Sequence, residues 1–232
     1  MADRAPAVPE NPLDWRPQQP MPARRALEIR DPIVEPLWSG TRVIAHLDHG
    51  WEAGVGPASG VRMIDSFGVD LAAEAPELAE AFRSAVRAED AIFDGILTDQ
   101  ATRSGAGAAI VTEARVSMMR MLTTQDTGVE VARRDEHADP REAFVAFDLL
   151  RLDGESLLDL PLLERKRLLE SVLDQSELVR VSVHARPPVE GWVASWKAAG
   201  LKGAMLKGAN SRYVPGGLCV AWRAVTRVAG RR

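Results

Sequence analysis

The sequence predicts a single domain that contains both strands and helices, of the α/β or the α+β class, and three observations lead to this prediction. Residues 144–150 form an almost unbroken apolar run of strand length, which is typical of a strand buried on both faces. A turn and a helical pattern follow that run directly. Further alternating strand patterns and amphipathic helical patterns are spread over the rest of the chain. Taken alone the central unit would fit an α/β or an α+β domain, and it lies at the centre of the predicted core.

The segment after the apolar run predicts a turn and then a helix. Asp153-Gly154 has the composition of a turn. Pro161 opens the next segment, where its missing amide hydrogen costs least. The apolar residues that then recur at helical spacing are Leu162, Leu169, Val172 and Leu173. The unit is therefore predicted to be strand, turn and helix.

The flanking segments supply further strands and helices. Alternating apolar residues predict strands at 43–48 and 61–65, joined at Asp48-His49-Gly50, and a strand region covers 91–97. Helical spacing predicts helices at 76–87 and 189–199, with Trp192 and Trp196 on one face of the second. Strands are also expected at 178–184, 202–207 and 218–225. Residues 99–125 are predicted to be loop, with a short helix at 116–122.

The first 30 residues differ from the rest in composition. Prolines at positions 6, 9, 12, 17, 20 and 22 remove amide donors and prevent regular pairing. Residues 1–30 are therefore expected to form an extended tail, laid across the domain by Leu13, Trp15 and Met21. Residues 31–232 are expected to form the single domain.

Composition narrows the class of protein. The chain has 232 residues, 46% hydrophobic and 27% charged, as in globular proteins. No apolar run approaches the roughly 20 residues that a membrane helix needs. The amino terminus lacks an apolar signal core, so a cytoplasmic location is expected. A single cysteine, Cys219, excludes an internal disulfide and a multi-cysteine zinc site.

Net charge bears on the partner. The chain carries a net charge of −4, whereas duplex binding usually begins with a basic surface that displaces counterions. The local basic candidates are Arg133-Arg134 and residues 227–232. We therefore expect a protein partner first, nucleic acid as a less favoured one, and no membrane. Only four lysines occur, at positions 166, 197, 202 and 207, which limits where a lysine nucleophile can lie.

The residue sequence of the central unit resembles that of one protein family. Residues 147–150 read FDLL, a Leu-Asp-Gly turn follows, and residues 160–165 read LPLLER. This succession is similar to that of ATP-dependent DNA ligase adenylation domains. The resemblance implies the α+β fold class and, within it, an ATP-grasp-like nucleotidyltransferase fold with antiparallel sheets flanked by helices. In that family an aromatic residue of this strand stacks on adenine; Phe147 or, second, Phe144 would hold that place, and the alternative is that both fill the core.

The family's first motif, Glu-x-Lys-x-Asp-Gly-x-Arg, matches residues 35–42 in part. Glu35, Gly40 and Arg42 are present. Leu37 stands in the lysine place and Ser39 in the aspartate place. The lysine amine of the family attacks the α-phosphorus of ATP, and leucine has no lone pair with which to do so. The resemblance thus implies a member that cannot adenylate itself by this route, with no catalytic residue in the usual place.

The later motifs depart in the same direction. The family's Ser-Arg-x-Gly turn lacks its arginine, because the chain reads Asp65-Ser66-Phe67-Gly68. Carboxylates are lost where Ile96 and Lys202 stand, and the final lysine places hold Ala224 and Thr226. Lys207 is kept. Because Mg²⁺ is held through carboxylate oxygens, no metal site is expected.

These matches predict a degenerate, non-catalytic binding or regulatory protein. Glu35, Arg42, Phe147 and Lys207 would line a vestigial nucleotide pocket, with fold support as their alternative role. No cofactor is firmly expected, and ATP or another nucleotide is the ligand that the resemblance allows. The competing hypothesis is an active nucleotidyltransferase or DNA ligase in DNA repair, which would use a non-standard lysine or a partner subunit. No C-terminal OB barrel is expected, since only residues 227–232 follow the last motif.

Overall fold

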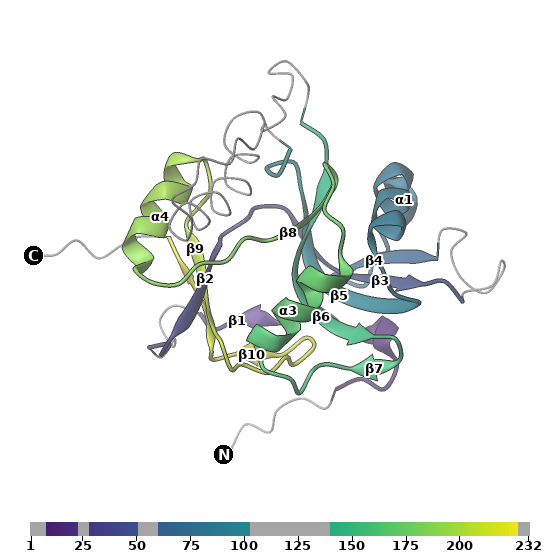
Figure 1. Ribbon diagram of the computed structural model, residues 1–232, viewed down its shortest axis with the longest axis horizontal. Helices are drawn as coiled ribbons and strands as arrows, with labels where there is room; N and C mark the ends of the chain where they lie inside the picture. Colours follow the sequence, from purple (N-terminus) through teal and green to yellow (C-terminus); the bar gives the residue numbers. More distant parts are fainter. Residues whose placement is uncertain (1–7, 23–27, 51–59, 103–139, 227–232) are drawn as a thin grey trace, which may run out of the picture.

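Two main sheets, antiparallel except for one strand, and three covering helices form most of the part of the chain that the structure describes, together with a two-stranded sheet of β1 and β10 (Figure 1). The computed structural model describes residues 8–22, 28–50, 60–102 and 140–226. The larger sheet has six strands. Five follow the order β4-β3-β5-β6-β7, and the sixth, β8, also pairs with β6. The smaller sheet has the order β11-β9-β2. The strands of the larger sheet are β3 (Thr41–Asp48), β4 (Val61–Asp65), β5 (Asp90–Thr98), β6 (Ala143–Leu152), β7 (Glu155–Ser156) and β8 (Val179–Val181).

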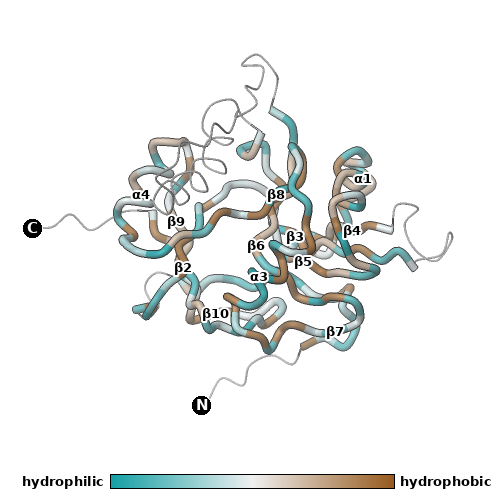
Figure 2. The backbone as a smooth tube through the Cα atoms, viewed as in Figure 1, coloured by the Kyte–Doolittle hydropathy of each residue, from teal (hydrophilic) through white to brown (hydrophobic). Residues whose placement is uncertain are grey.

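The predicted central unit is confirmed. The first eight residues of β6 are buried, and the strand is paired on both sides, with β5 and with β8. Asp153 and Gly154 make the turn with positive φ angles of 45° and 85°. Helix α3 (Leu162–Val172) then begins directly after Pro161. In Figure 2 brown, hydrophobic stretches lie along strands of both sheets. This agrees with strands whose faces are buried.

An aromatic cluster lies between the larger sheet and helix α1 (Pro76–Ala85). The ring of Phe82 meets the rings of Phe93 and Phe144 edge to face, at centroid distances of 5.4 and 5.1 Å. Phe144 is fully buried there, so its core role is the correct one of the two alternatives. Gly95 permits this packing, because a Cβ at that position would lie 2.3 Å from the ring of Phe144.

The smaller sheet consists of β2 (Pro32–Pro36), β9 (Ala204–Gly208) and β11 (Trp222–Val225). Helix α4 (Val189–Ala198) packs on it and buries Val193 and Trp196. The strand predicted at 178–184 is shorter than expected. It pairs with β6 over β8 alone, and Ala185 then bridges to Val34 of β2. The backbone therefore leaves the larger sheet to reach the smaller one, which ends the ladder early.

The described part of the amino-terminal segment, residues 8–22, is largely extended and packs on the domain. A 3₁₀ turn η1 (Pro12–Asp14) precedes β1 (Gln19–Pro20), which pairs in parallel with β10 (Leu218–Cys219). The predicted contact of Trp15 with the domain is present, since this side chain is 4% exposed and clusters with Ile44 and Trp222. The domain boundary at residue 30 stays a prediction.

Several predictions fall on residues that the structure does not describe. They are most of the loop at 99–125, the helix at 116–122, the pair Arg133-Arg134 and the carboxyl-terminal residues 227–232. Among the described helices, none combines the length and the apolar character that crossing a bilayer would need.

Candidate functional site

A cavity of about 300 Å³ lies between the two sheets and is lined by both. The loop after β2 forms one wall, and the other walls come from β3, β5, β6, β9 and β11, with Gln19 and Pro20 of β1 at an edge. Every residue singled out from the sequence as a site residue lines it. They are Glu35, Leu37, Ser39, Arg42, Ile96, Phe147 and Lys207, and Lys202 joins them.

The loop that carries Leu37 is held in place by backbone contacts. The Leu37 amide donates to the carbonyl of Gly203 over 3.0 Å, and the Ser39 amide donates to Gln100 Oε1 over 2.7 Å. Gly40 has a φ of 152°, and a Cβ there would lie 2.0 Å from the carbonyl oxygen of Leu97. Close approach to β5 therefore requires glycine at this point. The loop presents an aliphatic side chain to the cavity at residue 37.

Glu35 is the centre of a buried ionic trio. Its Oε1 lies 2.6 Å from Lys166 Nζ and its Oε2 lies 2.9 Å from Lys207 Nζ. All three side chains are at most 3% exposed. Burial would raise the pKa of Glu35, but the charges of Lys166 and Lys207 outweigh burial and hold this pKa below its usual value. Glu35 is thus an ionised counter-charge for two lysines.

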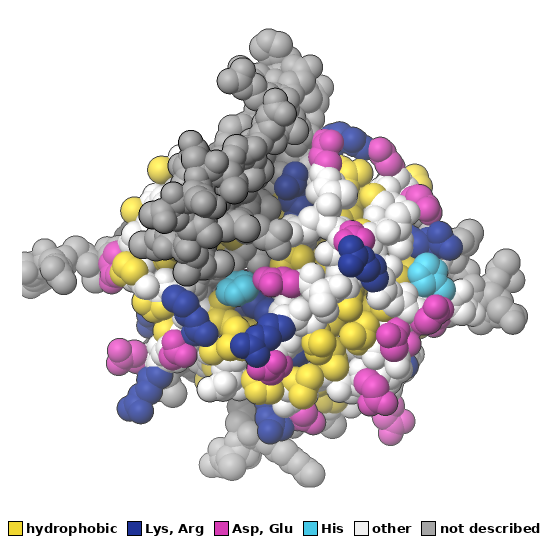
Figure 3. Space-filling view, in the orientation of Figure 1, with side chains coloured by type: hydrophobic (Ala, Val, Ile, Leu, Met, Phe, Trp, Pro, Cys, Tyr) yellow, Lys and Arg dark blue, Asp and Glu magenta, His cyan; other side chains and the backbone are white. Residues whose placement is uncertain are grey.

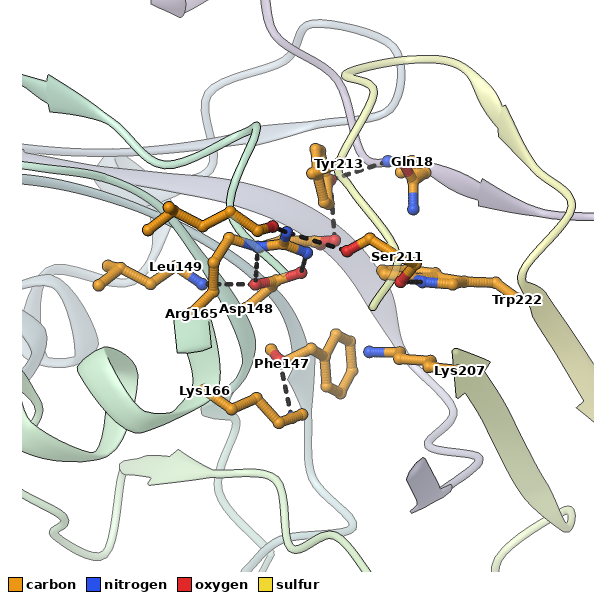
Figure 4. Close-up of polar contacts among 12 residues, drawn as sticks. Gln18, Phe147, Asp148, Leu149, Arg165, Lys166, Lys207, Ser211, Tyr213 and Trp222 are labelled. Carbon is orange, nitrogen blue, oxygen red and sulfur yellow. Dashed lines mark hydrogen bonds and ion pairs between the residues drawn. The ribbon is translucent and has the colours of Figure 1, made fainter. Parts of the chain in front are cut away.

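Lys207 also lies over two aromatic rings. Its Nζ is 4.2 Å from the ring centroid of Trp222 and 5.0 Å from that of Phe147, toward which it points in Figure 4. Burial lowers the pKa of Lys207, although the charge of Glu35 opposes this change. The guanidinium carbon of Arg42 lies 5.2 Å from the Phe147 centroid. Phe147 therefore lines the cavity with a cation near its ring, and it also packs in the core cluster beneath α4.

A chain of hydrogen bonds fixes Arg42. Its guanidinium donates to both carboxylate oxygens of Asp94, over 2.7 and 2.6 Å. The Tyr213 hydroxyl donates to Asp94 Oδ2 over 2.8 Å. It accepts from the backbone amide of Gln18 over 2.9 Å (Figure 4). Burial would lower the pKa of Arg42, but Asp94 more than compensates and raises it. Burial and Asp94 also raise the pKa of Tyr213 well above its ordinary value. Arg42 is thus a fixed, permanent cation at the cavity wall.

Two buried basic residues of α3 were missed by the sequence reasoning. Arg165 forms a bidentate ion pair with Asp148, and Lys166 donates to the carbonyl of Phe147 as well as pairing with Glu35. The sequence does contain a pattern that places Lys166 on the buried face of α3, because this residue falls four residues after Leu162. A hydrophobic pattern alone gives no reason for a cation there.

A divalent cation does not fit the side chains that line this cavity. Glu35 is the carboxylate among the described lining residues, and each of its oxygens is within ion-pair distance of a lysine. The nearby Asp94 is bound by Arg42 and Tyr213. Within the described ranges, no group of three or more His, Cys, Asp and Glu side chains could hold a metal ion. Mg²⁺, which the family resemblance implies, therefore finds no free carboxylate among the described residues that line the cavity.

Comparison with known proteins gives consistent matches. Residues 23–223 match the family described as the ATP dependent DNA ligase domain. A DNA ligase of Methanothrix thermoacetophila is 34% identical over 79% of this chain and 30% of its own length. The multifunctional non-homologous end joining DNA repair protein LigD of Mycobacterium tuberculosis is 29% identical over 81% of this chain and 20% of its own length. A solved mycobacterial DNA ligase D, complexed with ATP and MES, matches with a TM-score of 0.59 at 24% identity, covering 91% of this chain and 60% of that one.

The structural match shows the fold, so the predicted nucleotidyltransferase fold with antiparallel sheets and flanking helices is confirmed. The chain spans less than a third of the length of these two curated relatives. The match over residues 23–223 covers most of the chain. The chain therefore belongs to the ATP dependent DNA ligase domain family.

Proposed function

We propose that this chain is a non-catalytic, ligand-binding or regulatory member of the ligase adenylation family. One observation carries the proposal: Leu37 lines the cavity at the position where the family motif has its nucleophilic lysine. A hydrocarbon side chain cannot attack phosphorus, and Arg42 stays protonated.

The electrostatics of the cavity support this proposal. Self-adenylation needs an unprotonated amine, and Lys207 Nζ lies 2.9 Å from the carboxylate of Glu35. Lys202, the other lysine of the described lining, is exposed and follows Leu201 in the loop before β9. Ile96 presents an aliphatic group where the family motif has a carboxylate. The described lining thus retains cations for binding an anion and lacks the groups for phosphoryl chemistry.

The ligand that this lining fits is a nucleotide. Phe147, Trp38 and Trp222 supply aromatic surface, and Arg42 and Lys207 supply positive charge. A cavity of about 300 Å³ is at the lower end of the range for small-molecule sites. A thermal-shift titration with AMP, ADP and ATP tests this point, because a ligand selective for the folded state must raise the melting temperature. An unchanged melting temperature with all three would contradict nucleotide binding.

The absence of catalysis has a direct test. The protein is incubated with Mg²⁺ and α-labelled ATP, denatured, and assayed for covalent label. We expect no label on the chain or on the control variant Leu37→Met, which keeps an unreactive side chain of similar size. Covalent AMP on the unmodified chain would refute the proposal.

A second candidate, an active nucleotidyltransferase or DNA ligase, is favoured by one observation. Burial lowers the pKa of Lys207, which lines the cavity, and a lowered pKa is what a lysine nucleophile needs. This activity would require Lys207 to be released from Glu35, or a partner subunit to supply the missing groups. If label does appear, its loss in Lys207→Arg would identify this residue as the nucleophile.

For the macromolecular partner we propose a protein before nucleic acid. The net charge is −4, and acidic and basic side chains are interspersed over the face seen in Figure 3. A duplex-binding surface would instead concentrate basic residues. Fluorescence anisotropy with labelled nicked duplex at low salt should show little binding. Tight binding that weakens steeply with salt would reverse this order of preference.

A further inference from the structure

Positive charge exceeds negative charge around the cavity. Lys166 and Lys207 share the single carboxylate of Glu35, so this buried trio carries a net positive charge. Arg42 and Asp94 neutralise each other as a bidentate pair. Lys202 adds a further cation among the lining residues.

The polar groups of the cavity wall are arranged to donate hydrogen bonds. Ser39 Oγ is buried and has no hydrogen-bond partner among the described residues. It lines the same cavity as the Arg42 guanidinium and the Lys202 ammonium. A phosphate group accepts hydrogen bonds from hydroxyl, guanidinium and ammonium donors alike. A divalent cation, by contrast, needs oxygen ligands, and the carboxylates here are already bound by cations.

We infer that this cavity binds the phosphate groups of a nucleotide in their metal-free form. Lys202 and the net positive trio of Glu35, Lys166 and Lys207 take the charge-neutralising role that Mg²⁺ has for a nucleotide in solution, and Arg42 contributes as a hydrogen-bond donor. The inference rests on the proposed function and deepens it by naming the state of the ligand. Binding should therefore be strongest for the free polyphosphate anion. Mg²⁺ should compete with the cavity for that anion, because both neutralise the same oxygens.

Calorimetric titration of the full chain with ADP, in EDTA and in excess Mg²⁺, tests the inference. We expect Mg²⁺ to weaken ADP binding several-fold. The affinity for AMP should change little between EDTA and Mg²⁺, because AMP binds Mg²⁺ weakly. Tighter ADP binding in Mg²⁺ than in EDTA would overturn the inference and would leave the non-catalytic proposal standing.

Charge reversal at residue 202 is the matched variant test. Lys202 is exposed, so Lys202→Glu is not expected to disturb the fold. It should weaken ADP binding in EDTA by about tenfold, as expected for the loss of one charged contact. The control Lys197→Glu makes the same change at another exposed lysine that does not line the cavity, and it should leave ADP binding unchanged. Equal affinities for Lys202→Glu and the unmodified chain would contradict the inference.

Adenosine and inorganic pyrophosphate, each titrated alone, separate the two parts of the ligand. Pyrophosphate bound in EDTA and weakened by Mg²⁺ supports the phosphate assignment. Binding of adenosine with none of pyrophosphate overturns it, and so does the absence of binding by every one of these probes. Covalent labelling by ATP is measured separately, so failure of the non-catalytic proposal is recognised on its own.

Discussion

The ammonium of Lys207 lies 2.9 Å from the carboxylate of Glu35, and both side chains are almost completely buried. Lys166 approaches the other oxygen of the same carboxylate, so one anion compensates two cations. The trio joins the smaller sheet to α3, because Glu35 belongs to β2, Lys207 to β9 and Lys166 to α3. Lys166 also donates to the carbonyl of Phe147 in β6, which links this group to the larger sheet. Removing the anion would leave two uncompensated buried charges.

Glu35→Gln should therefore be strongly destabilising. Loss of one partner from a buried ion pair costs about 3–5 kcal/mol, and here both lysines lose their counter-charge. Urea denaturation followed by circular dichroism gives the change in the free energy of unfolding. The double variant Glu35→Gln/Lys207→Met should recover part of the loss. A Glu35→Gln variant within about 1 kcal/mol of the unmodified chain would show that the trio contributes little.

Stability should fall in acid because of His46. This imidazole is 3% exposed on β3, and burial together with Arg62, Arg16 and Arg151 lowers the pKa of His46 to about 3. The unfolded chain binds the proton near pH 6.5 and the folded chain only near pH 3, so stability is lost as pH falls between these values. The loss attributable to this residue is on the order of 5 kcal/mol at its largest.

Urea denaturation at a series of pH values measures this effect. His46→Phe should flatten the dependence of the unfolding free energy on pH between 6.5 and 3. His49→Asn is the matched control, because His49 is exposed in the turn after β3. An unchanged pH dependence in His46→Phe would show that other groups cause the acid loss, Glu35 among them, since its pKa is also lowered.

Tyr213→Phe should loosen Arg42 without unfolding the protein. The variant keeps the ring and removes the hydroxyl that donates to Asp94 and accepts from the Gln18 amide. Leaving a buried donor unpaired costs about 1–3 kcal/mol, measured as the free energy of unfolding. Nucleotide affinity should fall as well, because Asp94 would be less well placed to orient Arg42. Full stability together with full affinity would show that this hydrogen-bond chain is not needed.

Substitution by alanine should change protein stability in opposite directions at two glycines. A Cβ at Gly95 would lie 2.3 Å from the Phe144 ring and 2.7 Å from the Val145 carbonyl oxygen, so Gly95→Ala should destabilise by about 1–3 kcal/mol. Gly191 lies in α4, where a Cβ would meet no atom within 4 Å, and Gly191→Ala should stabilise by about 0.5–1 kcal/mol. Thermal denaturation of both variants checks the pair. Equal effects at the two positions would contradict the packing described around Phe144.

The local elements of the fold could be predicted because each has its cause within a few residues. The apolar run of β6, the positive φ angles at Asp153 and Gly154, and the proline before α3 are such cases. The cavity wall at Leu37 was also predicted, through the order of motifs that the family shares. The short length of β8 could not be predicted, since it depends on a bridge from Ala185 to Val34, which is far away in the sequence.

The ion pairs of the site could not be predicted for a related reason. Whether Lys166 is solvated or buried depends on where Glu35 lies, and the two residues are far apart in the sequence. The same holds for Gln18 and Tyr213, which are 195 residues apart. Hydrophobic periodicity finds the buried face of a helix or strand, but it does not identify a charged residue that is compensated by a distant partner.

The bond between Gln18 and Tyr213 has a practical consequence for anyone who shortens or tags this protein. Gln19 and Pro20 border the cavity, and the Gln18 amide supports the tyrosine that supports Asp94. A version that starts at residue 28 would lack the Gln18 bond and the core side chain of Trp15, so we expect it to be less stable and to lose part of the proposed nucleotide affinity. Changes within residues 12–20, which include η1, β1 and Gln18, would act on the cavity from outside the two main sheets.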